Sequence, residues 1–241
     1  TNLILMSNIR LFFSESLSIN LESKLNKSQS HYLTKVMRIK AGENFSLFNS
    51  NGEWMAKITE ISKGIAEFIV IEKLRHKDIT KEIWLAFSPI KSNYFNFMIQ
   101  KATELGVTRF IPIIFDRTIV RKINKERLEK IIIEATEQSN RINIPTLEKP
   151  QNLKKFLSNN LKKIDLVFTD LNTTKKKLEI NKEANKPLCA IVGPEGDFTE
   201  KERELILNFK SVKSININQN ILRAETATIS IISIIGYILS L

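Results

Sequence analysis

The hydrophobic pattern of this chain changes its period near residue 78. Before that point, short runs of alternating apolar and polar residues lie between turn signals, which is typical of strands with one buried face. After it, apolar runs of strand length alternate with stretches of helical period, which favours a parallel sheet covered by helices. The 241 residues therefore predict two domains, residues 1–78 and residues 79–241.

The first segment predicts a small β-barrel. Strands are expected at Ile9–Phe13, Asn44–Phe48, Glu53–Ile61 and Ile65–Leu74, with a short helix or turn at His31–Ile39. The pair Asn51-Gly52 predicts a tight hairpin, because these residues tolerate the positive φ that such turns need. Lys63-Gly64 marks the next turn. Several short strands at this spacing are typical of small barrels.

The second segment predicts an α/β domain. Strands are expected at Ile83–Phe87, Arg109–Phe115, Asp165–Thr169, Leu188–Val192 and Val212–Ile217. Helices are expected at Tyr94–Leu105, which Gly106 would end, from Asn124 to about Asn140, and from a Thr199–Glu202 capping box to about Phe209. The polar stretch Asn172–Lys186 is expected to be a solvated loop. Since parallel strands end at one edge of a sheet, ligands are expected in the loops there.

Composition limits the classes of protein and of site. The one cysteine, Cys189, excludes a disulfide framework, and two histidines argue against a metal centre, so no metal is expected. The apolar segment Ala227–Leu241 has 15 residues, fewer than the roughly 20 that span a bilayer, and is expected to be a buried helix. No signal peptide is expected at the start of the chain. These features predict a soluble cytoplasmic protein without a membrane partner.

The formal net charge of +11 is concentrated in the middle of the chain, since residues 117–177 carry 15 basic and 7 acidic side chains. A basic surface attracts phosphate backbones, which favours a nucleic-acid partner. Candidate phosphate contacts are Arg10, Arg38, Arg117, Arg121 and Arg141. Each of them could equally be a solvated surface charge, and biased codon usage would also raise the lysine content.

Two of only seven glycines lie in Gly193-Pro194-Glu195-Gly196, directly after an expected strand. Glycine at such a turn lets a ligand approach the backbone closely. The motif lacks the spacing of dinucleotide and phosphate loops, and Glu195 and Asp197 would repel a phosphate. A cationic or neutral ligand, for example a sulfonium compound, therefore fits better. An ordinary strand-to-helix turn is the alternative.

A second constellation, Ile221-Leu222-Arg223-Ala224-Glu225-Thr226-Ala227, follows the last expected strand. The arginine could hold a negative charge that develops on a substrate, and Glu225 could position the substrate or accept a proton. A structural ion pair or a helix N-cap would explain the same residues.

Five motifs in register resemble one family. They are His31…Val36-Met37-Arg38, Lys101-Ala102-Thr103-Glu104-Leu105-Gly106-Val107, Glu137-Gln138-Ser139…Arg141…Pro145, Gly193-Pro194-Glu195-Gly196 and Ile221-Leu222-Arg223-Ala224-Glu225-Thr226-Ala227. From Ile9 to the C-terminus, the chain resembles the bacterial RsmE-type 16S rRNA uridine-N3 methyltransferases of the SPOUT superfamily.

This resemblance implies a PUA-like β-barrel followed by a SPOUT α/β domain with a deep trefoil knot. It also implies S-adenosylmethionine (SAM) as the methyl donor, a homodimer with Ala227–Leu241 in its interface, and a uridine of 16S rRNA in the small ribosomal subunit as target. The residues implied to line the cofactor pocket are Thr169, Val192, Gly193, Pro194, Glu195, Gly196, Ile217, Asn218, Ile221, Leu222 and Ala227. We hypothesise that Arg223 steadies the negative charge of the uridine and that Glu225 or Glu195 positions the base or accepts its proton.

The chain departs from the family pattern at two places. The family usually has Gly-Gly after Pro-Glu, where this chain has Gly196-Asp197, and Leu-Gly-x-Arg where it has Ile217-Asn218-Gln219-Asn220. A left-handed backbone at Asn218 would keep the second turn, whereas Asn220 lacks the arginine side chain. Two other functions fit the sequence: a non-catalytic rRNA-binding assembly factor, and a methyltransferase of the same superfamily that acts on another RNA position.

Overall fold

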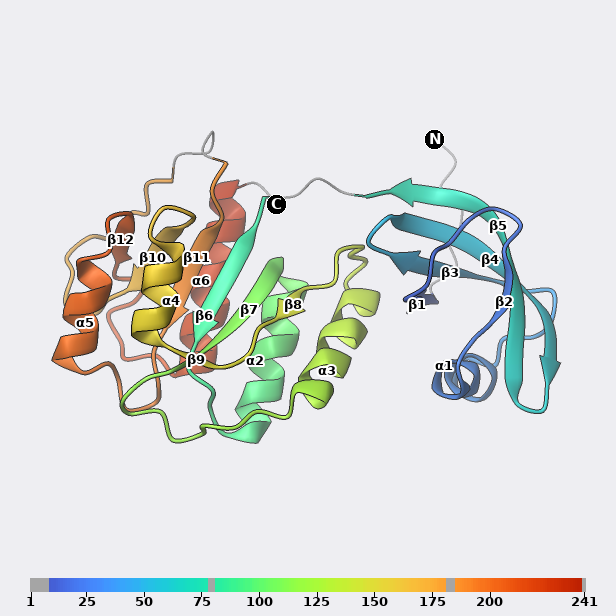
Figure 1. Ribbon diagram of the computed structural model, residues 1–241, viewed down its shortest axis with the longest axis horizontal. Coiled ribbons are helices and arrows are strands. Elements are labelled where there is room, and N and C mark those ends of the chain that lie inside the picture. Colours follow the sequence, from blue (N-terminus) through green and yellow to red (C-terminus); the bar gives the residue numbers. More distant parts are fainter. Residues whose placement is uncertain (1–8, 78–80, 181–184, 240–241) are drawn as a thin grey trace. The chain divides into compact units, whose positions relative to one another are not determined.

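The structure is a computed structural model that describes residues 9–77, 81–180 and 185–239 (Figure 1). The chain divides into two compact units. The first unit holds Thr1–Ile79 together with Thr136–Ile144, and the second holds Thr80–Ala135 and Pro145–Leu241. The boundary expected between residues 78 and 79 lies outside the described residues.

The first unit contains a five-stranded sheet in the order β1-β3-β4-β5-β2. Its strands are β1 (Arg10–Phe12), β2 (Glu22–Lys24), β3 (Asn44–Asn49), β4 (Gly52–Ser62) and β5 (Ile65–His76). Strands β1 and β3 pair in parallel, and the other pairs are antiparallel. Both expected hairpins are confirmed. A Cβ on Gly52 would overlap the carbonyl oxygen of Arg75, and Lys63 and Gly64 have φ of +49° and +79°.

A short helix, α1 (Lys27–His31), continues directly into one π-helical turn, η1 (Tyr32–Val36), which confirms the helix or turn expected there. The Asn26 side chain caps α1 by accepting a hydrogen bond from the backbone N of Gln29 at 2.9 Å. Leu33 and Ile39 are buried in the core beneath the sheet. The apolar side of this segment therefore attaches it to the strands.

The second unit contains a seven-stranded sheet in the order β12-β10-β11-β6-β7-β8, with β9 paired to β7. Its strands are β6 (Ile83–Phe87), β7 (Val107–Ile114), β8 (Thr146–Leu147), β9 (Gln151–Asn152), β10 (Asp165–Thr169), β11 (Leu188–Val192) and β12 (Val212–Ile215). The pairs are parallel, as expected. The described part of the expected loop Asn172–Lys186 has no helix or strand.

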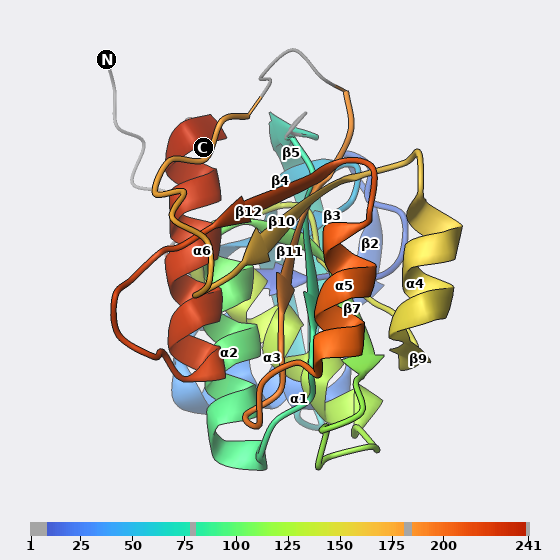
Figure 2. The same cartoon turned by 90° about the vertical axis from the view of Figure 1, so that its left-hand side faces the viewer.

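The helices of this part of the chain are α2 (Ser92–Glu104), α3 (Lys125–Gln138), α4 (Leu153–Asn160), α5 (Glu200–Leu207) and α6 (Ala224–Leu239). Figures 1 and 2 show α4 and α5 on one face of the sheet and α2 and α6 on the other. Three expected end signals are confirmed: Gly106 has φ +105°, the Asn124 side chain accepts from Arg127 N at 3.1 Å, and the Thr199–Glu202 capping box forms.

Helices on both faces explain why the central strands are apolar along their whole length. Phe156 of α4 and Ile206 of α5 join one buried cluster with Cys189 of β11. Ile231 of α6 and Met98 of α2 are fully buried on the other side. Burial raises the pKa of the Cys189 thiol, which stays a protonated core group. Across the described residues, no helix combines the length and the apolar character needed to cross a membrane.

Candidate functional site

The candidate site lies at the edge of the second sheet where β10, β11 and β12 end. These strands are neighbours in the order β12-β10-β11 and run in parallel, so the loops that follow them share one edge. The residues expected to line a cofactor pocket lie at the ends of β10 and β11, in the loops after β11 and β12, and in the first turn of α6; they are Thr169, Val192, Gly193, Pro194, Glu195, Gly196, Ile217, Asn218, Ile221, Leu222 and Ala227. Ile217 and Leu222 are half-buried, whereas the Ile221 side chain is 87% exposed.

The loop after β11 is a tight turn. The backbone N of Asp197 donates to the carbonyl of Pro194 at 3.0 Å, and Asp197 adopts a left-handed φ of +62°. Its Oδ1 also accepts a hydrogen bond from Phe198 N at 2.8 Å. Aspartate enters the left-handed region more readily than most residues. This explains how the chain forms the turn although it has Asp197 where the family pattern has glycine.

The loop after β12 keeps its turn in another way. The left-handed backbone expected at Asn218 is wrong, because the positive φ values of the described residues do not include this one. Instead, the side chain of Asn218 accepts a hydrogen bond from Asn220 N at 2.9 Å, and Asn216 does the same for Asn218 N at 3.1 Å. Two successive asparagine turns thus shape this loop.

Packing requires the first glycine of the loop after β11. A Cβ on Gly193 would lie 2.7 Å from Cε2 of Phe198. That ring packs edge-on against Phe115 and Phe168, with centroids 5.2 and 5.3 Å away. The loop therefore passes directly over an aromatic ring that is anchored in the core, which a side chain at position 193 would displace.

The loop after β7 is hydrogen-bonded to this edge. Arg117, one of the expected phosphate contacts, is exposed, and its Nη1 donates to the carbonyl of Gly196 in the glycine loop at 2.8 Å. Arg121 is exposed and donates to the carbonyl of Asp116 at 3.3 Å. Buried beneath, the hydroxyls of Ser88 and Thr118 lie 3.0 Å apart. The sequence does not predict this pair, because two uncharged hydroxyl residues 30 positions apart form no recognisable motif.

The three side chains expected to act on the substrate lie in the loop after β11, in the loop after β12 and in the first turn of α6. Arg223 is exposed just before α6, with its guanidinium carbon 5.6 Å from the ring centroid of Tyr94 in α2. Glu225 is half-buried in the first turn of α6, where the helix dipole favours a carboxylate. Glu195 is exposed in the loop after β11. Among the described residues, no ion pair joins Arg223 to either glutamate.

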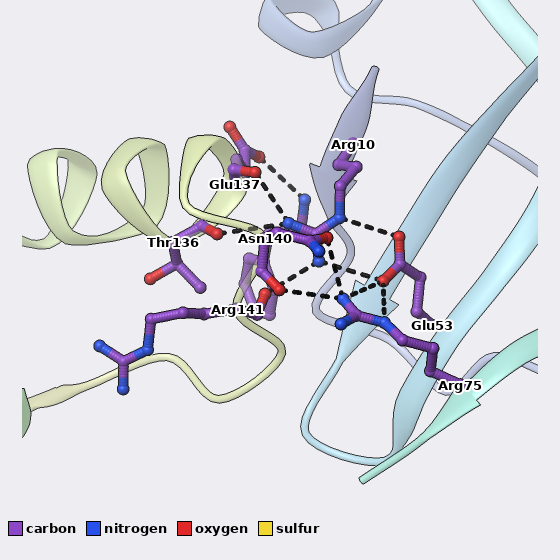
Figure 3. A network of polar contacts seen from close by, with 8 residues as sticks. Arg10, Glu53, Arg75, Thr136, Glu137, Asn140 and Arg141 are labelled. Atoms are coloured by element: carbon purple, nitrogen blue, oxygen red, sulfur yellow. Dashed lines mark hydrogen bonds and ion pairs between the residues drawn. The ribbon is translucent and has the colours of Figure 1, made fainter. Parts of the chain in front are cut away.

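Arg10 of the first unit does not agree with the phosphate contact expected from the sequence. Its side chain is 9% exposed. Its Nε donates to Glu53 at 2.8 Å, and its two Nη atoms donate to the carbonyls of Glu137 and Arg141 at 2.8 and 2.9 Å (Figure 3). The guanidinium also lies 4.5 Å above the ring of Phe48. Protein acceptors therefore occupy this cation.

Glu53 joins Arg10 to a second arginine. Its side chain is fully buried and also accepts from Arg75 Nε at 2.8 Å, and Arg75 donates to the carbonyl of Asn140 at 3.0 Å. Burial by itself would raise the pKa of Glu53. The hydrogen bonds and charges of the two arginines outweigh burial and hold this pKa below its ordinary value. This charge cluster secures the segment around Asn140 within the first unit.

The remaining two candidate arginines differ in exposure. Arg141 is half-buried, its side chain points away from Glu53 in Figure 3, and burial lowers its pKa to about 10. Arg38 is exposed and has a left-handed φ of +57°. The structure describes all three candidate arginines of the first unit, Arg10, Arg38 and Arg141. Of these, Arg38 is the one with an exposed side chain.

Two family models match the chain. One describes an RNA methyltransferase domain and covers residues 77–236, and the other describes an RNA methyltransferase PUA domain and covers residues 25–71. Together with the parallel sheet and the loops at its edge, these matches define the class as RNA methyltransferases that carry a PUA-like domain before a SPOUT domain.

Curated relatives and solved structures narrow this class. The chain is 35% identical to ribosomal RNA small subunit methyltransferase E of Rickettsia conorii, over 93% of each chain, and 30% identical to that of Aquifex aeolicus, over 94% and 99%. A SAM-bound structure of this enzyme from Neisseria gonorrhoeae matches 95% of this chain and 97% of its own, with 27% identity and a TM-score of 0.87. A SAM-bound methyltransferase from Legionella pneumophila, described as putative, gives 0.83 at 25% identity, with the same coverage of both chains. The chain belongs to the ribosomal RNA small subunit methyltransferase E family.

Proposed function

We propose that this protein transfers a methyl group from SAM to N3 of a uridine in the 16S rRNA of the small ribosomal subunit. The observation that carries the proposal is that the loops after β10, β11 and β12 share one sheet edge, with Arg223 and Glu225 at the start of α6. The names of the relatives and the SAM in two solved neighbours support it. The assignment of a uridine as the target, and of N3 as the methylated atom, rests on the family resemblance.

The residues at the edge fit a cationic cofactor. Glu195 and Asp197 are exposed carboxylates beside the turn, and they favour a sulfonium over a phosphate. The half-buried Ile217 and Leu222 offer apolar surface, and the backbone near Gly193 offers hydrogen-bonding groups for an adenosine. When bound, SAM supplies an electrophilic methyl group.

The residues of the chain then orient the uridine and handle its proton. N3 must lose its proton to attack the methyl carbon, and the base gains negative charge in that step. The guanidinium of Arg223 stabilises that charge, and Glu225 or Glu195 accepts the proton or positions the base. Alignment of two reactants can lower such a barrier by about 7–11 kcal/mol. Arg117 contributes by holding the carbonyl of Gly196.

The first unit is proposed to bind the RNA, and the second to carry the chemistry. A homodimer is supported by large exposed side chains on two helices, since Tyr94 and Phe97 of α2 are 47% and 46% exposed and Tyr237 of α6 is 86% exposed. Action on ribosomal RNA favours a cytoplasmic protein. The expected knot rests on the family resemblance.

The decisive experiment mixes the protein, labelled SAM and small subunits that lack the modification, and then maps the methylated base. Arg223→Ala should lower turnover at least about tenfold, with unchanged thermal unfolding. The matched control is Arg127→Ala, which removes an exposed arginine from α3. Wild-type turnover in Arg223→Ala would remove this residue from the mechanism.

Calorimetry with SAM separates the alternatives. Absence of SAM binding would favour a non-catalytic RNA-binding assembly factor. Methylation of another nucleotide would favour a related enzyme with a different target.

A further inference from the structure

The first unit exposes several apolar and basic side chains within one short segment of the chain. We call Tyr32, Lys35, Val36, Met37 and Arg38 the η1 surface. Tyr32, Val36 and Met37 are 41%, 58% and 39% exposed, and the two basic side chains are also exposed. Large apolar side chains that gather on a surface mark interaction sites more often than single ones do.

The backbone of the segment has an unusual shape that produces this exposure. Met37 N donates to the carbonyl of Tyr32 at 2.9 Å, which widens the last turn into a π-helix, and Arg38 follows with φ +57°. Leu33 and Ile39 remain in the core, and Ile39 N closes the turn on the carbonyl of Leu33 at 3.0 Å. Single π-helical turns and left-handed non-glycine residues are frequent at functional sites.

The charge of the segment points to a phosphate-bearing partner. Between Leu25 and Gly42 the chain has four Lys or Arg and no Asp or Glu. The flanking Glu43 accepts a hydrogen bond from the backbone N of Lys40 at 2.6 Å. Across the part of the chain that the structure describes, Lys35 and Arg38 have no ion-pair partner. The positive charge of the surface is therefore not neutralised within the protein.

We propose that the η1 surface binds an unpaired segment of RNA, with a base stacked on the ring of Tyr32 and phosphates held by Lys35 and Arg38. Proteins that bind single strands combine exposed aromatic rings with cations, because an unpaired base exposes its face for stacking and a duplex does not. A protein partner fits less well, since lysine is depleted in protein interfaces. The proposal rests on the proposed function, which makes RNA the substrate, and identifies a surface that holds it outside the catalytic edge.

The test measures binding of the full chain to a labelled single-stranded RNA of mixed sequence and to a duplex of the same length. Tyr32→Ala should weaken single-strand binding about 5- to 150-fold, and Tyr32→Phe should restore it. Lys35→Ala with Arg38→Ala should reduce the slope of log K against log salt by about 1.4, or roughly 0.7 for each phosphate. A matched control, Lys57→Ala with Lys73→Ala, removes two exposed charges from strands of the same unit and should leave the slope unchanged.

Three outcomes would overturn the proposal. The first is wild-type single-strand binding and slope in both η1 variants, and the second is an equal effect of Tyr32→Ala on duplex binding. The third is loss of binding to small subunits with unchanged binding to RNA, which would indicate a ribosomal protein as the partner. SAM binding by calorimetry should stay at the wild-type level in each variant. If the wild type binds RNA through Tyr32 but never methylates subunits, the proposed function fails and this surface assignment stands.

Discussion

Replacing Glu53 with glutamine should strongly destabilise the first unit. The Glu53 side chain is fully buried between Arg10 and Arg75, which are 9% and 27% exposed. Removing one partner of a buried ion pair costs about 3–5 kcal/mol, because the remaining charge is left uncompensated. Arg10 keeps the carbonyls of Glu137 and Arg141 as acceptors, and Arg75 reaches solvent. We therefore expect the lower end, about 3 kcal/mol.

Urea unfolding followed by tryptophan fluorescence measures this loss in one unit. The two tryptophans lie in different units, Trp54 in β4 and Trp84 in β6, so a Trp84→Phe background leaves Trp54 to report on the first unit alone. With a urea slope of about 1–3 kcal/mol per M, Glu53→Gln should lower the midpoint by about 1–3 M. The control Glu60→Gln, an exposed residue of the same strand, should stay within about 0.5 kcal/mol of wild type. A loss below about 1 kcal/mol in Glu53→Gln would refute a charge-stabilised cluster.

The lowered pKa of Glu53 makes the stability of the first unit depend on pH. The stabilisation by ionised Glu53 is complete above the ordinary glutamate pKa, about 4.3. It is lost as the pH falls through the lower pKa that Glu53 has in the folded protein. The urea midpoint should therefore fall on acidification below about pH 4.3, more in wild type than in Glu53→Gln. Gly193→Ala should cost about 1–3 kcal/mol in thermal unfolding, because its Cβ would lie 2.7 Å from the Phe198 ring; wild-type stability would contradict that packing. Asp197→Gly should be about 1 kcal/mol more stable than Asp197→Ala, since φ is +62° there, and equal unfolding temperatures of these two variants would count against a left-handed turn.

Elements with strong local signals could be predicted, and short elements defined by their neighbours could not. The capping box at Thr199 and the glycine at position 106 are contained in a few adjacent residues, and both were found where expected. Strand β2 has only three residues, and β8 and β9 have two each, so none shows a hydrophobic period. Helix α4 was missed because its eight residues contain just three apolar ones. Strand pairing and side-chain packing stabilise such elements, and neither can be read from the sequence of the segment alone.

The sequence by itself determined the two periods, the helix ends, and the polar and glycine-containing loops after the strands. Only the tertiary structure decided which of these loops are neighbours, because the strand order β12-β10-β11 is not encoded in any local pattern. It placed Arg117 on the carbonyl of Gly196 and Tyr94 beneath Arg223. It also decided that Arg10, which the sequence suggested as a surface cation, is a buried ion-pair partner of Glu53. A charged residue looks the same in sequence wherever it lies, and its role depends on whether water or a distant segment of the chain surrounds it.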